Sequence, residues 1–111
     1  AFFNVWKPLY RTVEEFPLAM CDETTADEED KLIMELKYSD RTGEIFVFRY
    51  SPKHRWYYFP RMTPDQALLL KTYESESKHA NSMGHSAFED PSSPINAPTR
   101  ESIEVRTMAF F

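Results

Sequence analysis

The chain has 111 residues, 41% of them hydrophobic, and a formal net charge of −5. This length suits one domain with a single hydrophobic core. The acidic balance disfavours nucleic acid as a partner, because phosphate binding needs clustered Lys and Arg. No apolar run is long enough to span a bilayer, and no signal-peptide pattern opens the chain, so we expect a cytoplasmic protein with no membrane partner. The single cysteine, Cys21, excludes an internal disulfide and is expected to be a small buried hydrophobe.

Aromatic and β-branched residues recur at short intervals between turn residues, which predicts a mainly β fold with little helix. In chain order, the expected strands are residues 2–6, 32–38, 44–50, 55–59, 67–73 and 101–111. The turn at 40–43 predicts a hairpin between the second and third strands, and the turn at 51–54 predicts another between the third and fourth. The stretch 75–99, rich in Ser, Pro and Asn, predicts loop.

Two segments allow more than one interpretation. Residues 22–30 hold six acids and no base, and their spacing does not match an EF-hand loop, so a solvated acidic loop is expected. Thr63, Pro64 and Gln66 fit the start of a helix with Thr63 as its N-cap. They fit equally a turn into a buried strand, and the strand is favoured because the apolar run that follows is short.

The segment 100–106 alternates between polar and apolar residues. On a strand, Ile103 and Val105 occupy one face, and the other face carries Arg100, Ser102, Glu104 and Arg106. The polar face would look at water in an ordinary sandwich, or inward in a barrel that encloses a charged cosubstrate. The sequence alone leaves both possibilities open.

A histidine precedes this segment at a spacing that suggests iron chemistry. His85 is followed by Arg100 and Ser102. Imidazole binds Fe(II), and a guanidinium fork with a hydroxyl can hold the far carboxylate of 2-oxoglutarate, as in a non-haem iron oxygenase. Many unrelated chains match this pattern by chance, and Arg100 could equally pair with Glu101 or Glu104 on the surface.

Five strings in order support a family resemblance. They are FNVWKPL at 3–9, PLAMCD at 17–22, HRWYYFP at 54–60, HSAFEDP at 85–91 and RESIEVR at 100–106. Together they resemble the asaB-type hydroxylase/desaturase family, akin to CmcJ-like and gibberellin desaturase-like 2-oxoglutarate/Fe(II) oxygenases. The resemblance covers essentially the whole chain. It implies a partial double-stranded β-helix, or jelly-roll, that binds Fe(II) and 2-oxoglutarate and hydroxylates or desaturates a small secondary metabolite.

The resemblance also implies roles for individual residues. His85 would be a metal ligand, and Arg100 with Ser102 would bind the 2-oxoglutarate carboxylate. The expected substrate-binding residues are Asn4, Trp6, His54, Trp56 and Tyr58, although the residues alone favour a packing or turn role for His54 and for the aromatic run. Gly84 stands where proline commonly precedes the histidine in the family, which could loosen the approach to His85.

The facial triad of such an enzyme needs a His-x-Asp or His-x-Glu pair, and none of His54, His79 and His85 has an acid two residues on. We therefore expect residues 1–111 to be the C-terminal part of a single oxygenase domain, inactive alone, whose partner is the remaining N-terminal half. The alternative is a truncated or degenerate non-catalytic β-domain that acts by association with a partner chain.

Overall fold

The computed structural model describes residues 1–76 and 82–110. The strands are β1 Phe2–Pro8, β2 Leu18–Cys21, β3 Lys31–Lys37, β4 Thr42–Phe48, β5 Trp56–Tyr58, β6 Leu68–Tyr73, β7 His85–Ala87 and β8 Ser102–Met108. The helical content of the described residues is limited to two 3-10 turns, Glu23–Thr25 and Glu28–Asp30. The predicted mainly β fold with little helix is confirmed.

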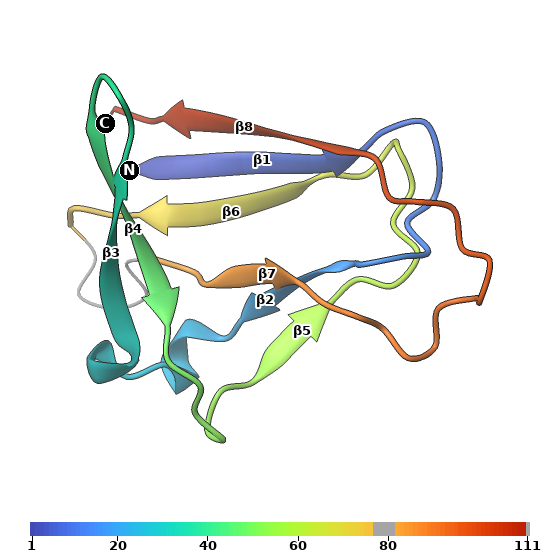
Figure 1. The fold of residues 1–111 in the computed structure, drawn as a ribbon, viewed down its shortest axis with the longest axis horizontal. Helices are drawn as coiled ribbons and strands as arrows, with labels where there is room; N and C mark the ends of the chain where they lie inside the picture. The colour runs from blue at the N-terminus through green and yellow to red at the C-terminus, as the bar shows by residue number, and fades with distance from the viewer. Residues whose placement is uncertain (77–81, 111) are drawn as a thin grey trace.

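The strands form two three-stranded antiparallel sheets and one hairpin (Figure 1). The first sheet has the order β6-β1-β8, and the second has the order β5-β2-β7. The β3–β4 hairpin is drawn across one end of the two sheets (Figure 1). Two facing sheets of this kind make up the partial double-stranded β-helix expected from the sequence.

Each three-stranded sheet has two edge strands. Among the described residues, β6 and β8 pair only with β1, and β5 and β7 pair only with β2. We call the outer sides of β7 and β8 the open edges. Edge strands carry backbone N–H and C=O groups that can pair with a further strand.

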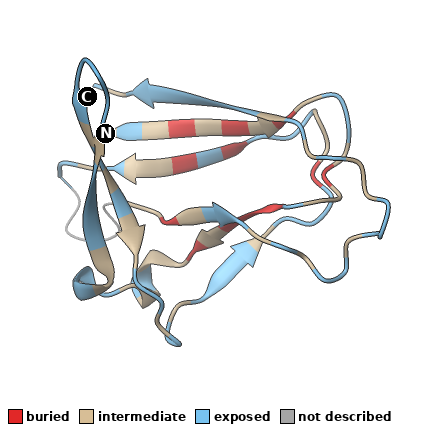
Figure 2. Cartoon of the chain, viewed as in Figure 1, coloured by how far each residue is buried: buried red, intermediate tan, exposed pale blue. Residues whose placement is uncertain are grey.

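The core lies between the two sheets (Figure 2). Its buried apolar cluster consists of Trp6, Val13, Leu18, Met62, Leu68 and Leu70. The register pairs Asn4 with Leu70 and Trp6 with Leu68, and directly opposed residues share a face of the sheet. The even-numbered residues of β1 therefore face the core.

The same register decides the orientation that the sequence left open for β8. Trp6 lies opposite Glu104, and Pro8 lies opposite Ser102. The polar face of β8 therefore shares the interior with Trp6. Ile103 and Val105 are on the outer face, where each is about half exposed.

The second predicted hairpin is wrong, because β5 pairs with β2 rather than with β4. A turn closed by the His54 N–H donating to the Ser51 carbonyl redirects the chain after β4. The chain then approaches β2, where the Asp22 N–H donates to the Arg55 carbonyl at 2.8 Å. A tight turn between two strands thus marks a change of sheet rather than a hairpin.

The ambiguous segment at Thr63 is a turn, and the strand interpretation is confirmed. The Gln66 N–H donates to the Thr63 carbonyl, and the Thr63 N–H donates to Gln66 Oε1, both at 3.0 Å. These reciprocal bonds close one turn. The chain then enters β6 at Leu68 rather than continuing as a helix.

The acidic segment 22–30 leads directly into the β3–β4 hairpin. Part of it is held by ion pairs and hydrogen bonds rather than being the solvated loop that the sequence predicts. Lys31 Nζ donates to Glu23 Oε1 at 2.6 Å, and the two side chains are 6% and 12% exposed. His54 Nε2 lies 2.9 Å from Asp30 Oδ2, and this hydrogen bond is the main reason that the pKa of Asp30 is lowered. Charge pairing therefore fixes much of this segment.

Gly84 is tightly packed, which gives a first test of the structure. A Cβ at Gly84 would lie 2.6 Å from Phe48 Cε2, so the Phe48 ring would have to shift. Gly84→Ala is therefore expected to lower the free energy of unfolding by about 1–3 kcal/mol, as overpacking does. Urea denaturation monitored by circular dichroism measures this change.

Gly43→Ala is the matched control for this substitution. A Cβ at Gly43 would meet Tyr38 Cε2 at 3.6 Å, which is an ordinary contact. Its stability is expected to stay unchanged or to rise by about 1 kcal/mol at most, because alanine reduces the freedom of the unfolded chain. Equal losses in the two variants would contradict the packing of Phe48 on Gly84.

Candidate functional site

His85 begins β7 and lies on its core face. Its Cα is opposite Met20, and Met20 packs against the buried cluster. Nδ1 of His85 is 3.2 Å from the Met83 carbonyl oxygen. With its proton on Nδ1, the ring donates to this carbonyl, and Nε2 keeps its lone pair for another group. Nε2 lies 4.0 Å from Oε1 of Glu104, so the imidazole faces β8 across the interior.

Glu104 connects His85 to the central strand β1. The Asn4 side-chain amide donates a hydrogen bond to Glu104 Oε1, and Asn4 is only 6% exposed. The three side chains form a polar cluster between the two sheets. Sequence reasoning placed Glu104 on the polar face of its strand, but it carried no signal that this face meets His85.

Arg100 and Ser102 border the same interior face. The Arg100 guanidinium carbon lies 5.7 Å from the centroid of the Trp6 ring, and Nη1 donates to the Phe16 carbonyl at 2.6 Å. Ser102 is half-buried opposite Pro8. Stacking on an aromatic ring and a bond to a fixed carbonyl hold the planar guanidinium in place. Phe16 is its one hydrogen-bond acceptor among the described residues, and a guanidinium has five N–H donors.

Two of the other three predicted site residues, Trp56 and Tyr58, do not share the strand face of His85. Trp56 and Tyr58 are opposite Cys21 and Ala19, on the face of β2 that alternates with the Met20 face. The Tyr58 hydroxyl donates to Asp90 Oδ2 at 3.1 Å.

His54 is also held by its neighbours. Its side chain is 3% exposed, pairs with Asp30 and packs edge-on against Phe48 with 6.1 Å between ring centroids.

Tyr57, which sequence reasoning did not select, is opposite Met20 and therefore on the His85 face, where it is 58% exposed. Strand alternation distinguishes Tyr57 from its neighbours, but only the pairing register shows which face is inward.

Cys21 is buried as predicted, at 1% exposure. Burial is the main cause that raises the pKa of its thiol. A buried thiol with a raised pKa is chemically inert, so Cys21 has a packing role.

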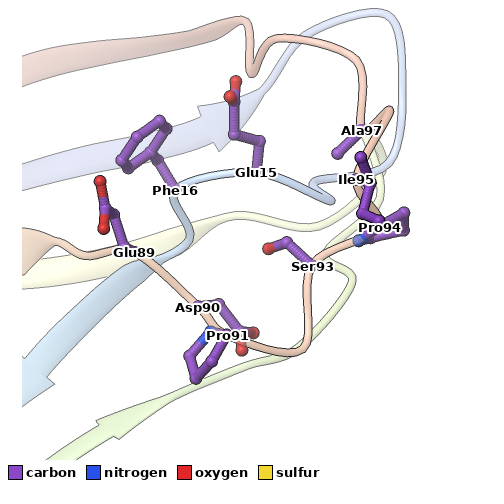
Figure 3. A pocket seen from close by; sticks show the side chains of 9 residues that line it. All are labelled: Glu15, Phe16, Glu89, Asp90, Pro91, Ser93, Pro94, Ile95 and Ala97. Atoms are coloured by element: carbon purple, nitrogen blue, oxygen red, sulfur yellow. The ribbon is translucent and has the colours of Figure 1, made fainter.

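A hollow of about 410 Å³ lies at the loop end of the molecule (Figure 3). Its walls come from two loop segments, and the lining residues are Glu15, Phe16, Glu89, Asp90, Pro91, Ser93, Pro94, Ile95 and Ala97. Hydrogen bonds from Ser92, together with one from Tyr58, lower the pKa of Asp90. None of the site residues predicted from the sequence lines this hollow.

The described residues supply only part of a metal site. Within 1–76 and 82–110, no group of three or more His, Cys, Asp or Glu side chains could hold a metal ion. His79 lies outside the described residues. His85 nevertheless has the chemistry of a metal ligand, because one ring nitrogen is held by a carbonyl and the other faces the partly exposed carboxylate of Glu104. The described part of the chain also has no helix of the length and hydropathy needed to cross a membrane.

Two facing antiparallel sheets, with an imidazole, a carboxylate and a guanidinium along their interior, define a partial double-stranded β-helix with a polar centre. A family model described as Oxidoreductase/YMDC permease-like domain matches residues 1–110. The chain belongs to this family, and the predicted relationship to the asaB-type hydroxylases/desaturases is confirmed.

Individual relatives agree with this assignment. The chain is 36% identical over 110 residues to the Fe(II)/2-oxoglutarate-dependent dioxygenase nvfI of Aspergillus novofumigatus, covering 97% of this chain and 40% of the relative. It is 32% identical to the hydroxylase/desaturase asaB of Aspergillus flavus, covering 100% of this chain and 55% of the relative. A solved structure of the iron and alpha-ketoglutarate-dependent endoperoxidase NvfI superposes with a TM-score of 0.87 at 34% identity, over 95% of this chain and 40% of that one. The chain thus spans between 40% and 55% of the length of these relatives.

Proposed function

We propose that the chain is the C-terminal part of a non-haem Fe(II)/2-oxoglutarate-dependent oxygenase domain that hydroxylates or desaturates a small secondary metabolite. One observation carries the proposal. The Arg100 guanidinium is stacked on Trp6, which is opposite Glu104, and Glu104 approaches His85. A cation suited to a carboxylate and an imidazole suited to a metal therefore border one interior surface.

Each residue has a separate task in this proposal. His85 would hold the iron through Nε2 while the Met83 carbonyl fixes the ring. Arg100 and Ser102 would hold the far carboxylate of 2-oxoglutarate. Asn4 and Trp6 would line the pocket, with Trp6 excluding water beneath the guanidinium. When bound, iron together with 2-oxoglutarate and O2 supplies the oxidising power, and this chain supplies positioning.

The remaining N-terminal half of the domain is the proposed partner of this chain. The open edges of β7 and β8 can each accept a further strand. The relatives are also roughly twice as long as this chain or longer, given the 40% and 55% that it covers. That half would bring the other two metal ligands.

We also propose that the enzyme is cytoplasmic. The free and buried Cys21 is compatible with a reducing compartment.

Binding of 2-oxoglutarate tests this function. Arg100→Met is expected to weaken 2-oxoglutarate binding about 10- to 100-fold, because a hydrogen-bonded charge pair contributes about 1.5–3 kcal/mol. Titration of the chain with 2-oxoglutarate, monitored through the indole NMR signal of Trp6, measures the affinity. The signal reports directly on the ring beneath the guanidinium.

Arg41→Met is the matched control. Arg41 is also a guanidinium above an aromatic ring, 4.7 Å from the centroid of Tyr38, but it lies at the hairpin turn. Its loss should leave 2-oxoglutarate binding unchanged. Equal effects of the two substitutions would refute the assignment of Arg100. No binding by the unaltered chain would instead favour the non-catalytic β-domain that associates through its open edges.

A further inference from the structure

We propose that Phe16 is a positioning residue for Arg100, and that its strained backbone orients the guanidinium for the carboxylate of 2-oxoglutarate. The inference rests on the proposed function of Arg100 as the residue that binds this carboxylate. It adds a residue that the His-Arg-Ser pattern does not contain, because Phe16 acts through its main-chain carbonyl. That carbonyl accepts a hydrogen bond from Arg100 Nη1 at 2.6 Å.

The backbone of Phe16 is in an unfavourable conformation. Its φ is 46°, in the left-handed region, where a bulky residue is an outlier. Phe16 also precedes Pro17, and the residue before a proline normally adopts an extended conformation. Burial of the ring does not explain the conformation, because Phe16 is 40% exposed and lines the hollow at the loop end (Figure 3). Such strain is concentrated at functional sites.

Contacts on both sides of Phe16 hold this conformation. Before it, the Val13 N–H donates to the Met62 carbonyl at 2.9 Å, and both residues belong to the buried cluster. After it, Pro17 is buried, and its carbonyl accepts from the Phe88 N–H at 3.3 Å. The segment between these two attachments is short, so the Phe16 carbonyl has little freedom to turn away from the guanidinium.

The Phe16 carbonyl and the Trp6 ring act together on the guanidinium. Arg100 Cζ lies 5.7 Å from the centroid of the Trp6 ring. Contact with a ring alone leaves the group free to rotate, and the hydrogen bond from Nη1 limits that rotation. Pairing of a guanidinium with a carboxylate through two parallel bonds depends on such a fixed orientation.

Two substitutions separate the backbone of Phe16 from its ring. Phe16→Gly removes the ring but tolerates a positive φ, whereas the β-branched side chain in Phe16→Ile strongly disfavours it. Phe16→Ile is expected to weaken 2-oxoglutarate binding about 10-fold, which corresponds to one hydrogen bond to a charged group. Phe16→Gly should keep the affinity of the unaltered chain. Titration with 2-oxoglutarate, monitored through the indole NMR signal of Trp6, measures both affinities.

The Nε–H NMR signal of Arg100 reports on the guanidinium without any ligand. Its exchange with water should be slow in the unaltered chain and in Phe16→Gly, and about 10-fold faster in Phe16→Ile, because the ordered hydrogen bond is lost. Circular dichroism shows whether each variant is folded. Phe16→Ala disfavours a positive φ less strongly, so it replaces Phe16→Ile if that variant does not fold, with a smaller change in the same direction.

Tyr10→Ile is the matched control. Tyr10 is another aromatic residue with a positive φ, 62°, but it lies in a turn closed by the Arg11 N–H and the Leu9 carbonyl. Its substitution should leave the Arg100 signal and the affinity unchanged.

Three results would overturn the inference. They are slow Arg100 exchange in Phe16→Ile, equal losses in Phe16→Ile and Phe16→Gly, and equal effects of Phe16→Ile and Tyr10→Ile. No 2-oxoglutarate binding by the unaltered chain would instead refute the proposed function of Arg100. The Nε–H signal would still decide whether Phe16 positions the guanidinium, so the two failures are distinguishable.

Discussion

Leu70→Ala is expected to lower the free energy of unfolding by about 2–5 kcal/mol, as large-to-small substitutions in a core do. Leu70 is 0% exposed on β6 and belongs to the buried cluster between the two sheets. The substitution would leave a cavity against Trp6, because these residues share the core face. Urea denaturation monitored by tryptophan fluorescence measures the loss, and Trp6 reports from within the same cluster.

The neighbouring residue on the same strand provides the control. Leu69 is 66% exposed on the outer face of the sheet. Leu69→Ala removes the same atoms from water-exposed surface, so stability should change by no more than about 0.5 kcal/mol. Comparable losses at both positions would mean that β6 does not present alternate faces to the core and to water.

Lys31→Met is expected to cost about 3 kcal/mol, the lower end of the range for removing one partner of a buried ion pair. The Lys31 side chain is 6% exposed, and its ammonium group donates to Glu23, whose Oε2 is buried without a hydrogen-bond partner. Removing the ammonium would leave the Glu23 charge unbalanced at the base of the hairpin. Denaturant unfolding of the two proteins at pH 7 measures the difference.

The pH dependence of this difference provides a second measurement. Burial alone would lower the pKa of Lys31, but the hydrogen bonds to Glu23 and Glu28 outweigh it, so the pKa is raised. The contribution of Lys31 is therefore complete below its ordinary pKa, and it is lost as the pH rises through the raised value. The stability gap between the two proteins should stay constant near neutrality and close only in strong alkali.

A surface variant is the control for Lys31. Glu28 also bonds to the Lys31 ammonium, at 2.8 Å, but its side chain is 85% exposed. Glu28→Gln should change stability by no more than about 1 kcal/mol, since exposed ion pairs contribute little. A larger loss in Glu28→Gln than in Lys31→Met would contradict the burial of the Lys31–Glu23 pair.

Six of the eight strands could be predicted because aromatic and β-branched residues mark them, as in Phe2–Pro8 and Thr42–Phe48. The two others could not. Leu18–Cys21 has four residues without a β-branched member, and His85–Ala87 has three residues in a stretch rich in Ser and Pro. Both exist as strands because neighbours pair with them, and such long-range pairing has no local signature in the sequence.

The candidate site, too, could be predicted only in part from the sequence. Strand alternation was sufficient to put Arg100, Ser102 and Glu104 on one side of the chain. The inward orientation of that side depends on the pairing of Trp6 with Glu104, which joins residues 98 positions apart. In the aromatic run, Trp56 and Tyr58 were the residues predicted to bind substrate. The pairing register instead places Tyr57 on the strand face that carries His85.

The central position of β1 has a consequence for how the chain reaches its native state. Both neighbours of β1 come late, at Leu68–Tyr73 and Ser102–Met108. During synthesis, β1 therefore cannot pair with its neighbours in the sheet until β6 and then β8 have emerged from the ribosome. Closing so large a loop is entropically costly, and topologies with such high contact order fold slowly. Chaperone dependence during expression would follow directly from this arrangement of strands.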